Sequence, residues 1–327
     1  MKPGRRALAT LSVTTVVATW LLLVIGGLVN PTGSSMACPD WYFIPTCNGE
    51  IIPADWSGGI LYEHGHRMWA SGVGLLTLLL GFALWRRADL DKTTKRLGLA
   101  AIVLVALQGT LGGITVKMNL SWFVSTSHLL LAMIFFSLVI VITGRVLAAP
   151  ASPNARSVGP RALVLVGAAL VAFQIIIGGL VRHLGAGLVC GDDWLGCGPG
   201  GFWPAGGAAQ IHMFHRIVGY TTAVVLFGIA VRSADALAAN GRPAWRAWLP
   251  ASLVMLQVAL GLLTVATGHS LAIVTLHTAV AGLVLASLVA LYLSLGPLGA
   301  PNGAGGTGIA AGANRTAPAP GSAEVAL

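Results

Sequence analysis

Four histidines stand inside long apolar stretches of this chain, at His66, His128, His215 and His277. Ionisable side chains are costly in a bilayer core, and where they occur they usually face a bundle interior, a partner group or a cofactor. A lone histidine in such a place is explained well enough by a hydrogen bond between helices. Four at matched places need a stronger explanation.

The matched places come from an internal repeat. His66 and His215 are 149 residues apart, as are His128 and His277. The same offset joins the glutamines of QGTLGGITV and QVALGLLTV, at positions 108 and 257. Each repeat therefore carries one histidine on its second apolar run and one on its fourth. Two imidazoles from facing helices can bind a haem iron axially, so the sequence predicts two haem sites.

The two repeats differ at one chemically important position. Glu63 precedes His66 by three residues and shares its helix face, and at the common offset it aligns with His212. Of the ten acidic residues, Glu63 alone falls in or at the edge of an apolar run. A carboxylate one turn from a haem ligand can move protons or stabilise a developing cation. The alternative is a salt bridge to Arg67 or an interfacial hydrogen bond.

Two arginines follow the first histidine of each repeat. Arg67 and Arg216 are expected to bind haem propionates, because a guanidinium group pairs with a carboxylate through two parallel hydrogen bonds. Pairing with Glu63 or with a backbone carbonyl is the other interpretation. His64 lies two residues from His66 and points to another face, so it has no assigned role.

The elements that position these residues are membrane helices. The 327-residue chain is 56% apolar and 9% charged, with a mean hydropathy of +0.83, which is typical of a polytopic membrane protein. Eight runs are long enough to span the bilayer: 11–30, 60–85, 97–116, 123–144, 162–181, 208–231, 248–268 and 271–294.

Basic residues gather at the termini and in alternate loops, and only Lys117 and Arg182 lie on the other side. This positive-inside pattern places both termini in the cytoplasm. It also accounts for the net charge of +9, which is therefore no sign of nucleic-acid binding. The cysteine pairs Cys38/Cys47 and Cys190/Cys197 fall in the two long outer loops, where an oxidising compartment favours one local disulfide in each.

These patterns predict an all-α integral membrane protein built as two pseudo-symmetric four-helix bundles. Because each repeat has an even number of spans, the second enters the membrane in the same orientation as the first. The expected N-terminal bundle is 1–145 and the C-terminal bundle is 162–295. A cytoplasmic linker over 146–161 joins them, and a disordered cytoplasmic tail follows over 296–327.

The combination of Glu63-x-x-His66-Arg67, His128, His215-Arg216, His277 and two outer-loop cysteine pairs resembles the haem A synthase family, over about residues 11–295. The resemblance is to its bacterial eight-helix members. It implies a multi-pass plasma-membrane enzyme that oxidises the C8 methyl group of haem O to a formyl group by successive hydroxylations, with Glu63 as the essential glutamate.

The resemblance also implies how the two sites are used. Substrate haem O would lie between His66 and His128, and a haem b cofactor between His215 and His277. The pair Cys38/Cys47 is linked in the family to haem transfer or redox steps, and the pair Cys190/Cys197 looks structural. Expected partners are a haem O synthase as donor, an electron-transfer protein and the assembling terminal oxidase; a homo-oligomer stays open.

Two other functions compete with this one. A di-haem cytochrome b that only carries electrons would need the histidines, but no glutamate in one half alone. It would also place haems near both membrane surfaces. A transporter built on a parallel repeat would not need four matched histidines.

Overall fold

The structure is a computed structural model that describes residues 3–41, 44–148, 158–191, 193, 195–198 and 201–296. Within these ranges the regular structure is helical, and the only strand-like pairing is an isolated bridge between Cys47 and Glu50. The elements are α1 (Pro3–Val29), α2 (Gly58–Arg86), α3 (Lys92–Lys117), α4 (Trp122–Leu147), α5 (Arg161–His183), the 3-10 turn η1 (Ala186–Leu188), α6 (Gly207–Ala238), α7 (Trp245–Ala266) and α8 (Leu271–Ser294).

All eight α-helices are long and apolar enough to cross a membrane, which confirms the eight predicted spans. Two helices extend furthest beyond their apolar runs. Helix α1 begins at Pro3 rather than at position 11, and α6 continues to Ala238 rather than ending at 231. Arginine, alanine and leucine are the commonest residues in these extensions, and because they are good helix formers the helix continues past the apolar segment.

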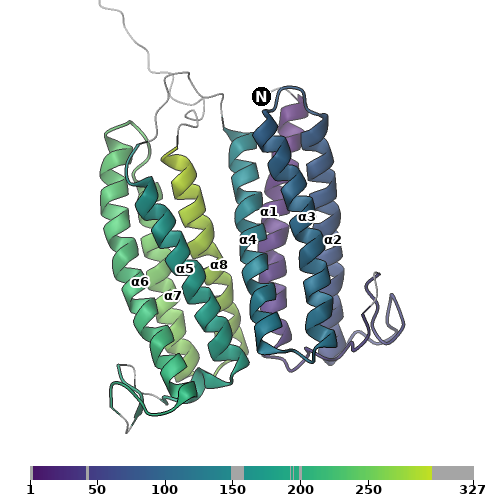
Figure 1. The fold of residues 1–327 in the computed structure, drawn as a ribbon, viewed down its shortest axis with the longest axis vertical. Helices are drawn as coiled ribbons and strands as arrows, with labels where there is room; N and C mark the ends of the chain where they lie inside the picture. The colour runs from purple at the N-terminus through teal and green to yellow at the C-terminus, as the bar shows by residue number, and fades with distance from the viewer. Residues whose placement is uncertain are drawn as a thin grey trace, which may run out of the picture.

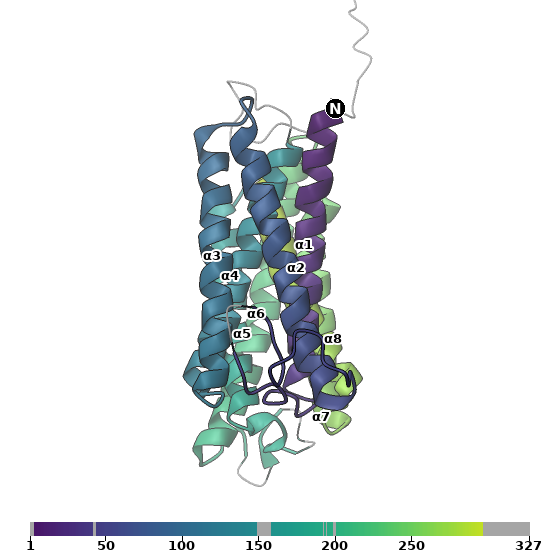
Figure 2. The same cartoon turned by 90° about the vertical axis from the view of Figure 1, so that its right-hand side faces the viewer.

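The helices are arranged as two groups of four, α1–α4 and α5–α8, as Figure 1 shows. Each group has its own buried apolar cluster, with Leu80 and Val139 in the first and Leu226 and Leu288 in the second. The groups meet where α1 packs on α8, α4 on α5, and α4 on α8. The view in Figure 2 looks onto α1 and α2, with the second group behind the first.

Hydrogen bonds help to hold the two helix groups together. The Trp20 indole donates a hydrogen bond to the Ala279 carbonyl, at 3.1 Å. Arg182 at the end of α5 donates to the Gly27 carbonyl at 2.7 Å and to the Asn30 side chain at 3.0 Å. The helices approach closely here, since a methyl group added to Gly27 would lie only 3.0 Å from Thr278. The interface therefore combines small residues with satisfied polar groups.

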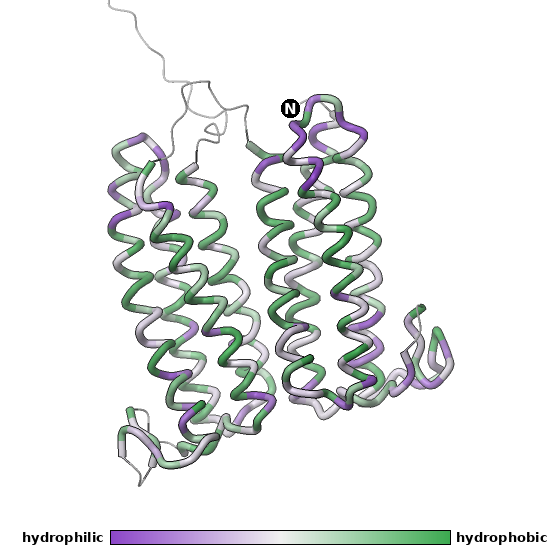
Figure 3. The backbone as a smooth tube through the Cα atoms, viewed as in Figure 1, coloured by the Kyte–Doolittle hydropathy of each residue, from purple (hydrophilic) through white to green (hydrophobic). Residues whose placement is uncertain are grey.

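The two long loops, between α1 and α2 and between α5 and α6, lie at one end of the molecule, and the N-terminus lies at the other (Figure 1). Hydrophilic segments gather at the helix ends and in these loops, while the middle of each helix is mainly hydrophobic (Figure 3). Most of the expected linker (146–161) and nearly all of the expected tail (296–327) fall outside the described residues.

Candidate functional site

The four intramembrane histidines each lie in the first two or three turns of a helix at the long-loop end. His66 and His215 are near the starts of α2 and α6, and His128 and His277 near the starts of α4 and α8. Each ring rests against a glycine of the preceding long helix. A methyl group added at that glycine would come within 2.8–3.2 Å of the ring carbon Cε1; the glycines are Gly26, Gly112, Gly178 and Gly261. Glycine leaves room for the rings at these positions, because an added methyl group would press against the imidazole.

Each helix group holds two of the rings, His66 and His128 in the first and His215 and His277 in the second, near enough to interact electrostatically. The Nδ1 atoms of His66, His128 and His277 are buried and have no hydrogen-bond partner. Buried polar atoms are normally satisfied, so these unpaired imidazole nitrogens are candidates for binding a ligand. This donor set suits haem iron, which takes two histidines from opposite sides of the macrocycle.

Glutamine side chains lie beside two of these rings. In α3, Gln108 donates to the His128 backbone carbonyl at 3.0 Å and approaches the ring nitrogen Nε2 at 3.4 Å. In α5, Gln174 donates to the His215 backbone carbonyl at 2.8 Å and lies 3.0 Å from Nδ1 of its ring. The Gln108 bond thus joins α3 to α4. Gln174 was not singled out from the sequence, because it has no counterpart in the first repeat.

Glu63 is only 4% exposed, and both of its carboxylate oxygens are bound. Oε2 accepts a hydrogen bond from the backbone N–H of Cys38 at 2.8 Å, and Oε1 forms an ion pair with Arg67 at 2.7 Å. The ion pair is one of the alternatives that the sequence left open. The Cys38 contact could not be predicted, because it depends on how the loop folds back over α2. Together the two contacts hold the carboxylate in one orientation, one helical turn before His66.

Arg67 also holds the loop itself, donating to the Asp40 and Thr46 carbonyls at 2.7 Å and to the Cys38 carbonyl. Arg216 does the same in the second group, where it donates to the Gly196 carbonyl at 2.9 Å and to the Asp193 carbonyl. The predicted role of both arginines in binding haem propionates stays a prediction. What the structure adds is that each guanidinium group fastens an outer loop to the helix that carries a histidine.

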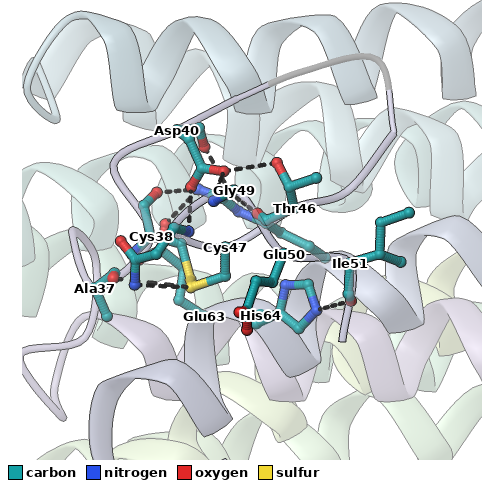
Figure 4. The surroundings of a disulfide bond; sticks show 12 residues. Ala37, Cys38, Asp40, Thr46, Cys47, Gly49, Glu50, Ile51, Glu63 and His64 are labelled. Carbon is teal, nitrogen blue, oxygen red and sulfur yellow. Dashed lines mark hydrogen bonds and ion pairs between the residues drawn. A yellow bond between two sulfur atoms is a disulfide. The ribbon is translucent and has the colours of Figure 1, made fainter. Parts of the chain in front are cut away.

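Both loops contain a disulfide, Cys38–Cys47 and Cys190–Cys197, in the pairing expected from the sequence. The first is shown in Figure 4, where Glu63 and His64 lie beside it. Asp40 accepts hydrogen bonds from the Thr46 hydroxyl and from the backbone of Asn48 and Gly49. Partial burial alone would raise the pKa of Asp40, but these hydrogen bonds outweigh it and hold the pKa below its usual value. The loop is thus organised around an ionised aspartate.

His64 has a definite place in this loop region. It is fully buried, one ring nitrogen lies 2.9 Å from the Ile51 carbonyl, and Trp56 packs on its ring. A nitrogen of the ring lies within 4.8 Å of both disulfide sulfurs. This agrees with the expectation that His64 points away from His66. Its contacts are with the disulfide loop.

Eight apolar helices in two groups, with two intramembrane histidines in each group, define a multi-pass membrane protein. The model of the COX15-CtaA family, described as cytochrome oxidase assembly protein, matches residues 57–289. The chain belongs to this family.

The sequence is also similar to curated relatives over nearly their whole length. The chain is 29% identical to the heme A synthase of Geobacillus kaustophilus over 281 residues, covering 84% of this chain and 86% of that protein. It is 28% identical to the heme A synthase of Rhizorhabdus wittichii, covering 88% and 93%. The heme A synthase of Halalkalibacterium halodurans is 25% identical, with 89% and 97% covered.

Proposed function

We propose that this chain is a haem A synthase, an oxidoreductase of the bacterial plasma membrane that converts the C8 methyl group of haem O into a formyl group. Family membership and the full-length relatives support the activity. The observation that carries the assignment is Glu63. It is a buried, doubly bound carboxylate one turn from His66, in one helix group only.

The first helix group, within 1–145, would hold substrate haem O between His66 and His128. The second, within 162–295, would hold a haem b cofactor between His215 and His277. The placement of two rings in each helix group, the unpartnered Nδ1 atoms and the glycines under the rings support this ligand set. When bound, the cofactor haem supplies electron transfer; the groups that bind, orient and exchange protons belong to the chain.

Glu63 would act on the methyl carbon at the edge of the substrate. Two hydroxylations turn the methyl group into a geminal diol, and loss of water from the diol leaves the formyl group. A carboxylate beside this carbon stabilises positive charge that develops there and accepts the hydroxyl proton as water leaves. Cys38 and Arg67 fix the carboxylate in place before the reaction, so no reorganisation is needed in the transition state.

Two features argue against the alternative, a di-haem cytochrome b that only carries electrons. Such a carrier has no use for an acid in one half alone, and the second group has His212 at the position of Glu63. A carrier across the membrane also needs haems near opposite surfaces. Here all four histidines lie toward the long-loop end of their helices.

The finer architecture belongs to the same proposal. The two groups would be related by a pseudo-two-fold axis along the membrane normal, which is supported by the matched ring-to-glycine contacts. Both termini would be cytoplasmic. A haem O synthase would supply the substrate, an electron-transfer protein would complete the redox balance, and the assembling terminal oxidase would receive haem A.

The test is Glu63→Gln, which keeps the size of the side chain and removes its charge. We expect haem binding to persist and haem A formation to fall below detection when the variant is expressed with a source of haem O. Chromatography of the extracted haems measures both. Glu50→Gln, in the same outer loop, is the matched control and should give normal haem A. A normal haem A yield from Glu63→Gln would refute the catalytic role.

The ligand set is tested separately, by spectra of the purified protein. His215→Ala or His277→Ala should remove the low-spin spectrum of a haem with two histidine ligands. An unchanged spectrum would contradict the pairing. Haem b together with haem O or haem A in the wild-type extract would support the synthase, whereas haem b alone would favour the electron carrier.

A further inference from the structure

Helices α2 and α3 pack closely in the half of their length that is remote from the long loops. A methyl group added to Gly81 would lie 2.5 Å from the Ile102 side chain, and one added to Gly98 would lie 2.9 Å from Leu84. The two backbones approach each other here over glycines, as membrane helices commonly do.

The same helix faces are open in the other half, where the histidines lie. Gly74 is seven residues before Gly81, and Gly109 is eleven residues after Gly98. These spacings are about two and about three helical turns, so each pair of glycines shares a face. A methyl group added to Gly74 or Gly109 would meet no described atom within 4 Å, and Gly109 is exposed. We call the facing surfaces at Gly74, Gly109 and Gly113 the outer seam.

Trp41 covers the end of the outer seam. A methyl group added to Gly113, one turn beyond Gly109, would overlap the Trp41 indole, so the ring lies against the backbone of α3. The neighbouring Asp40 carbonyl accepts a hydrogen bond from Arg67 of α2 at 2.7 Å. The outer loop is thus fastened to α2 and reaches across to α3 through the indole.

The covered end of the seam adjoins the first two histidines. Gly112, next to Gly113 in α3, lies under the His128 ring. Arg67, which holds the loop, directly follows His66 in α2. Trp41 therefore bridges the two helices at the level of the first site.

The second helix group differs at each position of the seam. The three glycines are replaced, at the repeat offset of 149, by Ala223, Val258 and Leu262. Ala223 and Val258 line the same apolar hollow on α6 and α7, together with Tyr220, so these positions do face each other. Because even a methyl group at Gly113 would overlap the indole, Leu262 leaves no room for a ring placed as Trp41 is.

We propose that substrate haem enters and product haem leaves the first site between α2 and α3, from the lipid, and that Trp41 is the gate that closes this passage. The inference rests on the proposed function, since it takes the first site to be the substrate site. A substrate must be exchanged at every turnover, whereas a cofactor stays in place, which suits the larger side chains of the second group. A loop side chain can move aside while the helices stay packed, because loops open at a low free-energy cost.

Rates of haem exchange test the gate. Purified full-length protein in lipid nanodiscs is depleted of haem and mixed with vesicles that contain haem b, and the low-spin absorbance reports uptake. Mixing loaded protein with empty vesicles reports release, and the phases lost in His128→Ala belong to the first site. The open form of a two-state gate is typically about 0.1–10% populated, so Trp41→Ala should speed both uptake and release at the first site by about 10-fold or more.

Gly109→Val should have the opposite effect, because it places in the seam the side chain that the second group carries. Uptake and release at the first site should both slow. Valine is a better helix former than glycine, so the substitution does not weaken α3. Gly72→Val is the matched control, since Gly72 is exposed on α2 with no described atom within 4 Å of an added methyl group, and it should leave both rates unchanged.

Two further variants separate the gate from general effects on the loops. Trp203→Ala removes an exposed tryptophan from the other long loop and should leave the first-site rates unchanged. If Trp41→Ala does not fold, Gly113→Ala decides, because the added methyl group displaces the indole and should speed both rates.

First-site rates that Trp41→Ala and Gly109→Val leave unchanged would overturn this inference and leave the proposed function standing. Faster release with unchanged uptake in Trp41→Ala would also overturn it, because a side chain that merely touches bound haem changes release alone. A wild-type protein that takes up no haem b, or phases that all survive His128→Ala, would overturn the proposed function and the inference with it.

Discussion

The buried ion pair Glu63–Arg67 matters both for the proposed chemistry and for the stability of the fold. The side chains are 5% and 12% exposed, so neither charge is well hydrated. The two charges are paired with each other, and both also bind the backbone of Cys38. The Cys38 N–H donates to Glu63 Oε2, and the Cys38 carbonyl accepts from an Arg67 Nη group. A buried charge that loses its partner is costly, whereas replacement of the whole pair by neutral groups is much less so.

Arg67→Leu should therefore destabilise the protein by roughly 3–5 kcal/mol, because it leaves the Glu63 carboxylate buried and unpaired. Arg216→Leu is the matched control, since it removes loop contacts without stranding an acid, and should cost only about 1–3 kcal/mol. Adding Glu63→Gln to Arg67→Leu should recover part of the loss. Thermal unfolding in detergent measures all four proteins, and equal losses for the two arginines would contradict the argument.

Residue types and spacing were enough to predict which side chains matter most. Glu63 and the four histidines stand out because an ionisable group is costly inside a membrane and usually has a function where it occurs. Contacts made by loops were not predictable. The Cys38 N–H bond to Glu63 and the packing of Trp41 on Gly113, where an added methyl group would overlap the indole, depend on how residues far from the helix fold back.

At the scale of elements, the apolar runs predicted the helices because the bilayer demands them, but the helix ends follow local chemistry. Helix α3 begins after Asp91, whose side chain accepts a hydrogen bond from the Thr94 backbone at 3.0 Å and so caps the helix. The Thr94 hydroxyl and Arg145 also donate to it. Partial burial alone would raise the pKa of Asp91, but these hydrogen bonds outweigh it and lower the pKa to about 2.

Because the folded pKa lies below the ordinary value of 3.8, the charged form of Asp91 stabilises the fold above about pH 4. This contribution is lost as the pH falls from about 4 to about 2. Asp91→Ala should cost about 1 kcal/mol at pH 7, the usual value of an N-cap. The ion pair with Arg145 adds little, since the carboxylate is 54% exposed.

Asp91→Asn keeps a capping oxygen without the charge, so it isolates the pH-dependent part of the stability that Asp91 contributes. Thermal unfolding should show wild type more stable than Asp91→Asn at pH 7, with the difference disappearing near pH 2. A difference that stays constant over this range would show that the charge of Asp91 contributes nothing.

At the scale of the whole molecule, the repeat in the sequence accounts for the two helix groups and for the matched positions of the histidines. The contacts between the groups were not predictable from it. Trp20 and Arg182 bind backbone carbonyls of other helices, and a periodic pattern does not specify such partners. The repeat did not point to Gln174, because a comparison of the two copies picks out polar residues that occur in both, and Gln174 occurs only in the second.

The proposed orientation can be tested because the chain has no free thiol: its four cysteines form two disulfides. A single new cysteine therefore reports its own side of the membrane. Ala88, between α2 and α3, and Met118, after α3, are exposed at opposite ends of the molecule. Arg86 and Arg87 adjoin Ala88, and the positive-inside rule places such a loop in the cytoplasm.

In intact cells, a maleimide that cannot cross membranes should label Met118→Cys. It should label Ala88→Cys only after permeabilisation. Mass shifts on a gel measure both, and a denatured sample of each variant controls for thiol reactivity. The reverse pattern would place the disulfide loops in the cytoplasm, where disulfides rarely persist. It would also turn the end at which Glu63 and the histidines lie toward the cytoplasm, so the result fixes the side of the membrane nearer to the site.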